Sequence, residues 1–296
     1  MIRRNMLAVM AAVSVAALMP GVASAQAFKS DRISVTTTGQ GKDVILIPGL
    51  SSSPRVWKEI ISAVPGYRYH LVQVAGFAGA PAGGNATGDT VAAPVAEELA
   101  RYIAVNKLAA PAVIGHSMGG TMGMMLAARH PASVSKLMVV DMFPFIGAMF
   151  GGPNATAESV KPIADGIFAQ MTKSDEVTRK TQRDAVIAGM INTESMRAGA
   201  LEDSAKSDTD VSARAYRELV VTDLRPELPR ITAPTTVLYV TPKGVPLSDA
   251  QMDGYYQASY ATLKGATLKR IPDAAHFIMW DQPVRFQQEV KAFLAK

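Results

Sequence analysis

The amino-acid sequence predicts an α/β fold in which helices cover both faces of a doubly wound, mostly parallel sheet. Short runs made almost entirely of Val, Ile and Leu recur along the chain, as buried parallel strands require. Helical stretches alternate with these runs, and Pro54, Pro131 and Pro283 lie at the expected helix boundaries. Strands that alternate with helices indicate a sheet built from successive crossover units.

The first expected strand differs from those that follow it. "RISVTTTG" (32–39) alternates apolar and polar residues, which is typical of an antiparallel edge strand. The expected buried strands are 43–49, 69–76, 111–116, 136–141, 235–241 and 266–272. The expected helices are 54–63, 89–105, 117–129, 248–261 and 282–294.

One interval interrupts the alternation of strands and helices. Residues 143–225 contain no convincing strand and read as helical and polar, with scattered Met and Phe. Because this interval lies between two core strands, we expect a helical insertion over the carboxyl ends of the strands, in the manner of a lid. The predicted core therefore comprises residues 28–142 and 226–296.

Composition and charge exclude several classes of protein. The chain has 296 residues, of which 48% are hydrophobic and 19% charged, as in a globular protein. Removing the charges of Arg3 and Arg4, which lie in an expected export signal, from the formal net charge of +5 leaves +3. This small and evenly spread charge favours neither nucleic-acid nor membrane binding. With no cysteine, the chain has neither disulfides nor thiolate metal sites.

Residues 1–27 have the layout of a cleaved secretory signal peptide. A basic start is followed by the apolar run "MLAVMAAVSVAALM" (6–19) and by the small residues of "ASAQA" (23–27). The apolar run is too short to span a bilayer comfortably, so no stable membrane insertion is expected. We expect an exported protein, periplasmic or secreted.

The stretch "VIGHSMGGTMG" (113–123) places Ser117 between Gly115 and Gly119, at the point where a strand ends and a helix begins. A sharp strand-to-helix turn needs small residues two positions on either side of the serine, and it holds the hydroxyl at the carboxyl edge of the sheet. The N-terminus of the new helix then faces any oxyanion formed there. This context favours a nucleophile over a glycine-rich packing turn.

Four motifs in order resemble those of the α/β-hydrolase family over almost the whole mature chain. "GHSMGG" is similar to its nucleophile elbow, "LIPGLSSSPRVW" (46–57) to its oxyanion loop, "VAGFAGAP" (74–81) to its Gly-rich loop and "DAAHFIMWDQP" (273–283) to its histidine segment. The resemblance implies an eight-stranded sheet with a helical cap inserted after the sixth strand.

A serine hydroxyl needs a neighbouring base, and histidine titrates in the suitable range. In the family the chain order is serine, acid, histidine, and His276 alone among the four histidines leaves room for an intervening acid.

The acid departs from the usual family pattern, because Gly244 stands where an aspartate after the next-to-last strand is expected. Asp141, at the end of the preceding strand, is the predicted acid, with Asp249 and Asp253 as alternatives. By resemblance, the backbone N–H groups of Leu50 and Met118 form the oxyanion hole.

The resulting prediction is a serine hydrolase that cleaves carboxylic esters through an acyl-enzyme and needs no cofactor or metal. Aromatic and Met residues are expected to line a pocket for a small or medium apolar acyl group: Trp57, Phe143, Phe145 and Met149. A cofactor-free perhydrolase or haloperoxidase, an acyltransferase and a C–C bond hydrolase remain alternatives on the same triad, and a non-catalytic binding protein remains one on the same fold. The oligomeric state does not follow from the sequence.

Overall fold

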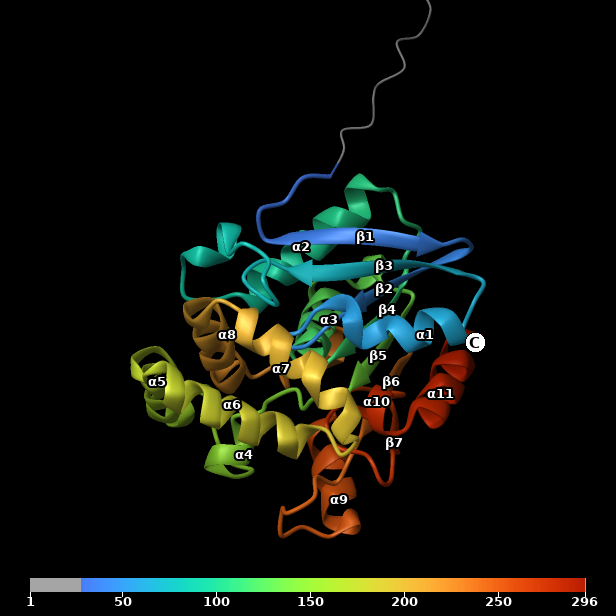
Figure 1. Ribbon diagram of the computed structural model, residues 1–296. Coiled ribbons are helices and arrows are strands. Elements are labelled where there is room, and N and C mark those ends of the chain that lie inside the picture. Colours follow the sequence, from blue (N-terminus) through green and yellow to red (C-terminus); the bar gives the residue numbers. More distant parts are fainter. Residues whose placement is uncertain (1–27, 296) are drawn as a thin grey trace, which may run out of the picture.

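The computed structural model describes residues 28–295, so the expected signal peptide at 1–27 lies outside the described residues. A seven-stranded sheet runs through the molecule in the order β1-β3-β2-β4-β5-β6-β7 (Figure 1). β1 pairs antiparallel to β3, and all other neighbouring strands are parallel. The strands are β1 (Ile33–Gly39), β2 (Lys42–Ile47), β3 (Tyr67–Val74), β4 (Ala112–His116), β5 (Lys136–Val140), β6 (Thr235–Tyr239) and β7 (Thr267–Arg270).

All seven strands expected from residue patterns are present, whereas the eighth strand implied by the family resemblance is not found within residues 28–295. The described chain enters the sheet through a turn at Ser30. The Oγ atom of Ser30 accepts hydrogen bonds from the backbone N–H groups of Arg32 (3.0 Å) and Ile33 (3.2 Å). These contacts turn the chain directly into β1, the antiparallel edge strand.

The central strands are buried on both faces, which explains their nearly continuous apolar sequences. Along β2, Ile45 and Ile47 join one core and Val44 and Leu46 join the other. The first core packs against α2, α3 and α9, and the second against α1 and α11. The core helices are α1 (Lys58–Ala63), α2 (Ala92–Val105), α3 (Met118–Arg129), α9 (Asp249–Ser259), α10 (Ile278–Asp281) and α11 (Pro283–Ala295).

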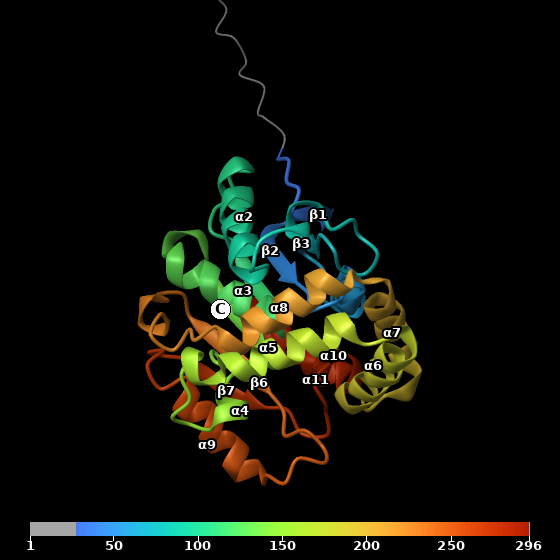
Figure 2. The same cartoon turned by 90° about the vertical axis from the view of Figure 1, so that its left-hand side faces the viewer.

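The interval 143–225 contains helices and no strand, as its sequence predicts. Its helices are α4 (Ala148–Gly151), α5 (Ala157–Lys173), α6 (Glu176–Met190), α7 (Arg197–Lys206) and α8 (Thr209–Val221). α5 and α8 lie side by side, and Figure 2 shows both in front of the carboxyl ends of the strands. We call residues 143–225 the helical insertion; it lies between β5 and β6.

No helix among residues 28–295 combines the length and the apolar character that crossing a bilayer requires.

Candidate active site

The turn from β4 to α3 holds Ser117 in an unusual backbone conformation. Its φ is 54° and its ψ is −124°, a region that costs a residue with a side chain about 1–3 kcal/mol. Backbone hydrogen bonds fix the turn: the Ser117 N–H donates to the carbonyl of Val140 (2.9 Å), and the Ser117 carbonyl accepts from the N–H groups of Gly120 (2.7 Å) and Thr121 (3.2 Å). Such local strain is typical of a functional residue held by a rigid scaffold.

Close backbone packing explains the two glycines of the motif. A Cβ atom on Gly115 would collide with the carbonyl oxygen of Gly119, and a Cβ atom on Gly119 would collide with the carbonyl oxygen of Ile47. Both obstacles are backbone atoms, which cannot move aside as a flexible side chain can. The turn can therefore form only when both positions lack a side chain.

Replacing Gly119 by alanine is expected to lower the free energy of unfolding by about 2–4 kcal/mol, because the added methyl group forces α3 away from the end of β2. Gly166→Ala is the matched control. Gly166 is an exposed residue of α5 where an added methyl group would meet open space, so alanine should stabilise the protein by about 0.5–1 kcal/mol. Urea denaturation measures both values. Equal stability of the two variants would contradict the packing explanation.

His276 and Asp141 form a direct pair at the same edge of the sheet. The Nδ1 atom of His276 lies 2.6 Å from Oδ2 of Asp141, and both side chains are largely buried, with 20% and 10% of their surface exposed. Asp141 follows β5 with a φ of 52°, and its backbone N–H donates to the carbonyl of Leu238 (2.7 Å). A carboxylate at Nδ1 orients the ring and leaves Nε2 as the nitrogen available for a reacting group.

The two alternative acids lie elsewhere. Asp249 and Asp253 both pair with Arg270, at 2.7 Å and 2.9 Å, and Asp253 also accepts a hydrogen bond from the hydroxyl of Tyr239 (2.9 Å). The structure therefore brings Asp141, and neither alternative, to His276. Asp281 anchors the histidine loop by accepting a hydrogen bond from the N–H of Ala275 (2.8 Å).

Ser117 and His276 come from neighbouring loops, but the described residues include no hydrogen bond between the hydroxyl and the imidazole. His116, which adjoins Ser117, packs against His276 with 4.6 Å between ring centroids. Its Nε2 lies 3.0 Å from the carbonyl oxygen of His276, which ties the histidine loop to the elbow. Catalytic hydrogen bonds are often long in a free enzyme and shorten when substrate binds.

The remaining histidines have other partners. Complete burial, reinforced by the nearby His276, holds the pKa of His116 well below its ordinary value, so this ring stays neutral. His70 lies between Asp43 (2.8 Å) and the hydroxyl of Tyr102 (2.7 Å), and His130 contacts Glu97 (2.8 Å). None of the three pairs with the carboxylate of Asp141.

The two predicted oxyanion donors lie on loops that meet at Ser117. A Cβ atom placed on Gly49 would lie 3.0 Å from Cβ of Ser117, so the loop that carries Leu50 passes directly against the serine. Met118 is the first residue of α3, where backbone N–H groups have no partner within the helix. Within residues 28–295, neither the Leu50 nor the Met118 N–H donates a hydrogen bond to another protein atom.

The helical insertion holds the loop after β2 through buried polar contacts. Asp203 of α7, 4% exposed, accepts hydrogen bonds from the backbone N–H (3.1 Å) and the hydroxyl (2.5 Å) of Ser53. The hydroxyls of Ser51 and Ser212 of α8 lie 2.9 Å apart. The backbone that carries Leu50 is thus fixed from the insertion as well as from the sheet.

The structure does not bring the four predicted pocket residues together. Trp57 is fully buried and stacks on Phe286 in the core, and Phe145 is buried under α5 and α8. Met149 is 62% exposed on α4. Phe143 alone lies beside the site, half-buried, where it stacks on Tyr256. For Trp57 and Phe145 the pocket prediction is wrong because large aromatic side chains fill the cores beneath the loops.

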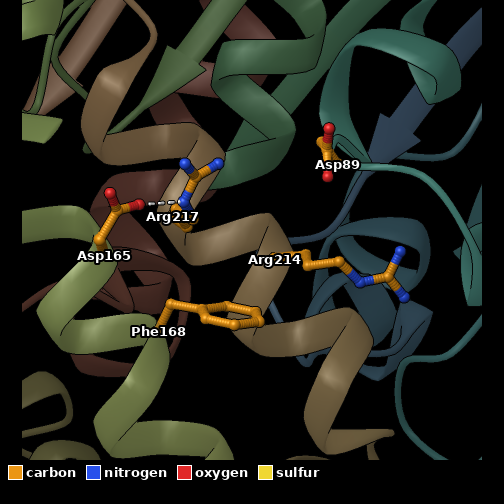
Figure 3. A pocket seen from close by; sticks show the side chains of 5 residues that line it. All are labelled: Asp89, Asp165, Phe168, Arg214 and Arg217. Atoms are coloured by element: carbon orange, nitrogen blue, oxygen red, sulfur yellow. Dashed lines mark hydrogen bonds and ion pairs between the residues drawn. The ribbon is translucent and has the colours of Figure 1, made fainter.

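A surface hollow of about 370 Å³ lies between α5, α8 and the loop that contains Asp89 (Figure 3). Phe168 lines it, and three of its charged groups have partners: Arg217 Nε contacts Asp165 (2.5 Å), and Arg214 donates to backbone carbonyls, including that of Gly88 (2.6 Å). The hollow contains none of the candidate catalytic residues.

Sequence reasoning missed Asp203 and Tyr256, which contact the site from distant segments. Asp203 is 150 residues from its partner Ser53, and Tyr256 is 115 residues from its partner Asp141. No local motif marks either residue. The helices that carry them, α7 and α9, also lack a marked apolar face, so periodicity does not single out either residue.

Comparison with known proteins places this site in context. Residues 44–289 match the sequence model described as the alpha/beta hydrolase family. A pimeloyl-[acyl-carrier protein] methyl ester esterase of Pectobacterium carotovorum is 27% identical over 267 residues, which cover 87% of this chain and 96% of that protein. The pimeloyl-[acyl-carrier protein] methyl ester esterase of Aeromonas hydrophila is 32% identical over 114 residues, a match that spans 38% of this chain and 42% of that relative.

The solved structure of an esterase from Exiguobacterium antarcticum has a TM-score of 0.74 with 20% sequence identity and covers 89% of this chain and 96% of that one. At this level of identity the likeness concerns the fold alone. It agrees with the α/β fold and the mostly parallel sheet expected from the sequence.

Proposed function

The chain belongs to the alpha/beta hydrolase family, and on that basis we propose that it is a serine hydrolase that cleaves carboxylic esters through an acyl-enzyme. The observation that carries the proposal is the 2.6 Å contact between His276 Nδ1 and Asp141 Oδ2, at the edge of the sheet where the strained turn presents Ser117. The esterase names of the relatives that match the chain support the same reaction.

In the first half of the reaction, His276 Nε2 takes the proton of the Ser117 hydroxyl as the oxygen attacks the acyl carbon. The carbonyl oxygen becomes negatively charged and accepts hydrogen bonds from the N–H groups of Leu50 and Met118. The C–O bond of the ester then breaks, and the imidazolium returns its proton to the leaving alcohol. Asp141 stabilises the imidazolium and holds the ring in the required tautomer.

In the second half, water replaces the alcohol. His276 removes a proton from the water as its oxygen attacks the acyl-enzyme, and the same two N–H groups hold the negative charge. The bond from the acyl carbon to Ser117 breaks, the serine oxygen takes the proton from His276, and the carboxylic acid leaves.

We assign the helical insertion the role of a cap that covers the site and helps to shape its oxyanion loop. The contacts from Asp203 and Ser212 to the loop of Leu50 support this role. The preferred substrate in this proposal carries a small or medium apolar acyl group, with Phe143 on the acyl side. Export through the segment 1–27 would place this activity outside the cytoplasm.

Asp203→Asn is expected to lower kcat about tenfold, because the amide loses the charge-assisted hydrogen bond to Ser53 and the loop that carries Leu50 loosens. Glu202→Gln is the matched control. Glu202 and Asp203 both pair with Arg55, but the side chain of Glu202 is exposed. Steady-state kinetics on one ester compares the two variants. The cap role is contradicted when both variants retain the kcat of the unmodified protein.

Hydrolysis of p-nitrophenyl esters of increasing acyl length tests the proposed function. We expect turnover with an optimum at short or medium chains and a steep fall for long chains. Complete inactivity on every ester in the series, by a protein that is folded according to circular dichroism, would contradict an esterase.

A further inference from the structure

We propose that Tyr256 of α9 is a positioning residue that holds the catalytic carboxylate of Asp141 in place for His276. This inference rests on the proposed function. The two oxygens of the carboxylate have separate partners: Oδ2 contacts His276 Nδ1 at 2.6 Å, and Oδ1 accepts a hydrogen bond from the Tyr256 hydroxyl at 3.1 Å. The backbone N–H of Val240, at the end of β6, also donates to Oδ1 (3.2 Å). With Oδ1 fixed, rotation of the carboxylate away from the imidazole breaks two hydrogen bonds.

The ring of Tyr256 is itself held on both sides. It stacks on Phe143 with 4.1 Å between ring centroids and on Tyr239 with 4.0 Å, and it is 2% exposed. A ring enclosed in this way keeps its hydroxyl at one place. Burial, together with the charge of Asp141, raises the pKa of Tyr256 well above its ordinary value, so the hydroxyl keeps its proton and remains a donor.

The position of the acid explains why such support is needed. Asp141 directly follows β5 in a left-handed conformation, and the loop after β6 offers it a backbone donor, the N–H of Val240. α9 follows that loop and supplies a side-chain donor to the same oxygen. The titratable groups that face Asp141 are His276, Tyr256 and, more distantly, Tyr260, whose hydroxyl donates to the carbonyl of Met142 (2.6 Å).

Tyr256→Phe removes the hydroxyl and keeps the stacked ring. Tyr239→Phe is the matched control: it removes a hydroxyl from the same stack, but that hydroxyl bonds Asp253, which does not contact His276. We expect Tyr256→Phe to lower kcat roughly tenfold with KM changed by less than about twofold, since the loss affects the transition state and not substrate binding. Tyr239→Phe should match the unmodified protein in both constants.

A second measurement separates this inference from the proposed function because it needs no substrate. Titration of ¹⁵N-labelled imidazoles by NMR follows His276 directly. Without the Tyr256 donor, more negative charge remains on the carboxylate and the imidazolium is favoured, so we expect the midpoint of His276 to move to higher pH in Tyr256→Phe. 3-Fluorotyrosine at position 256, a stronger donor in a nearly unchanged ring, should move it to lower pH even if the phenylalanine variant folds poorly.

Identical His276 titrations in the unmodified protein, Tyr256→Phe and the fluorotyrosine protein would overturn the positioning role. Inactivity of the unmodified protein on esters would instead overturn the proposed function, and the NMR titrations would still decide whether Tyr256 controls the Asp141–His276 pair.

Discussion

Replacing Ser117 by alanine is expected to lower kcat for a p-nitrophenyl ester by about 10⁴-fold or more. Without the hydroxyl no acyl-enzyme forms, and only the oxyanion donors and substrate binding remain to accelerate direct attack by water. Initial rates at saturating substrate measure the loss. Thermal unfolding establishes that the variant is folded, because alanine adds no atoms to the crowded turn.

Ser62→Ala provides the matched control for this experiment. Ser62 is an exposed residue of α1 whose hydroxyl contacts only the carbonyl of Lys58 among the described residues (3.3 Å). This variant should retain the full kcat. Retention of comparable activity by Ser117→Ala would show that the serine is not the nucleophile.

Asp141→Asn is expected to have the second largest effect, a fall in kcat of about 10⁴-fold. An amide keeps the shape of the carboxylate but loses its charge, and its NH₂ group can face His276 Nδ1 as a donor. The imidazole then adopts the wrong tautomer, and Nε2 carries a proton where a base is needed. The measurement is kcat for the same ester as for Ser117→Ala.

The controls are the two alternative acids, Asp249→Asn and Asp253→Asn. Both residues pair with Arg270, and His276 pairs with neither of them. Each of these variants should stay within about threefold of the unmodified kcat, as expected for partly exposed ion pairs. If Asp141→Asn kept nearly full activity while Asp249→Asn or Asp253→Asn lost it, the catalytic acid would be that other residue and not Asp141.

Features of the fold that depend on short sequence segments could be predicted. The central strands are apolar on both faces because a core lies on each side of the sheet. In β2, Val44 joins one core and the adjacent Ile45 joins the other. The nucleophile turn was recognisable because Gly115 and Gly119 must lack side chains for reasons confined to one turn and the end of β2. The contact between Asp141 and His276 follows from the meeting of parallel strands at one edge.

Features that depend on distant contacts could not be predicted. Trp57 and Phe145 are residue types that often line apolar pockets, yet both are completely buried. Trp57 packs against Phe286, and Phe145 packs against α8. Tyr256 reaches Asp141 only because α9 packs back toward β5, and no periodicity in the sequence encodes that approach. The family resemblance implied an eighth strand, whereas the sheet formed by residues 28–295 has seven.

Reaction with a fluorophosphonate, followed by mass spectrometry of peptides, tests the central claim most directly. The reagent phosphonylates only a serine whose proton is removed by a neighbouring base and whose oxyanion is held. We predict one adduct, on the peptide that contains Ser117, formed rapidly by the unmodified protein and very slowly by His276→Ala. An adduct on another residue, or ester hydrolysis that continues with Ser117 unlabelled, would contradict the claim that Ser117 is the nucleophile activated by His276.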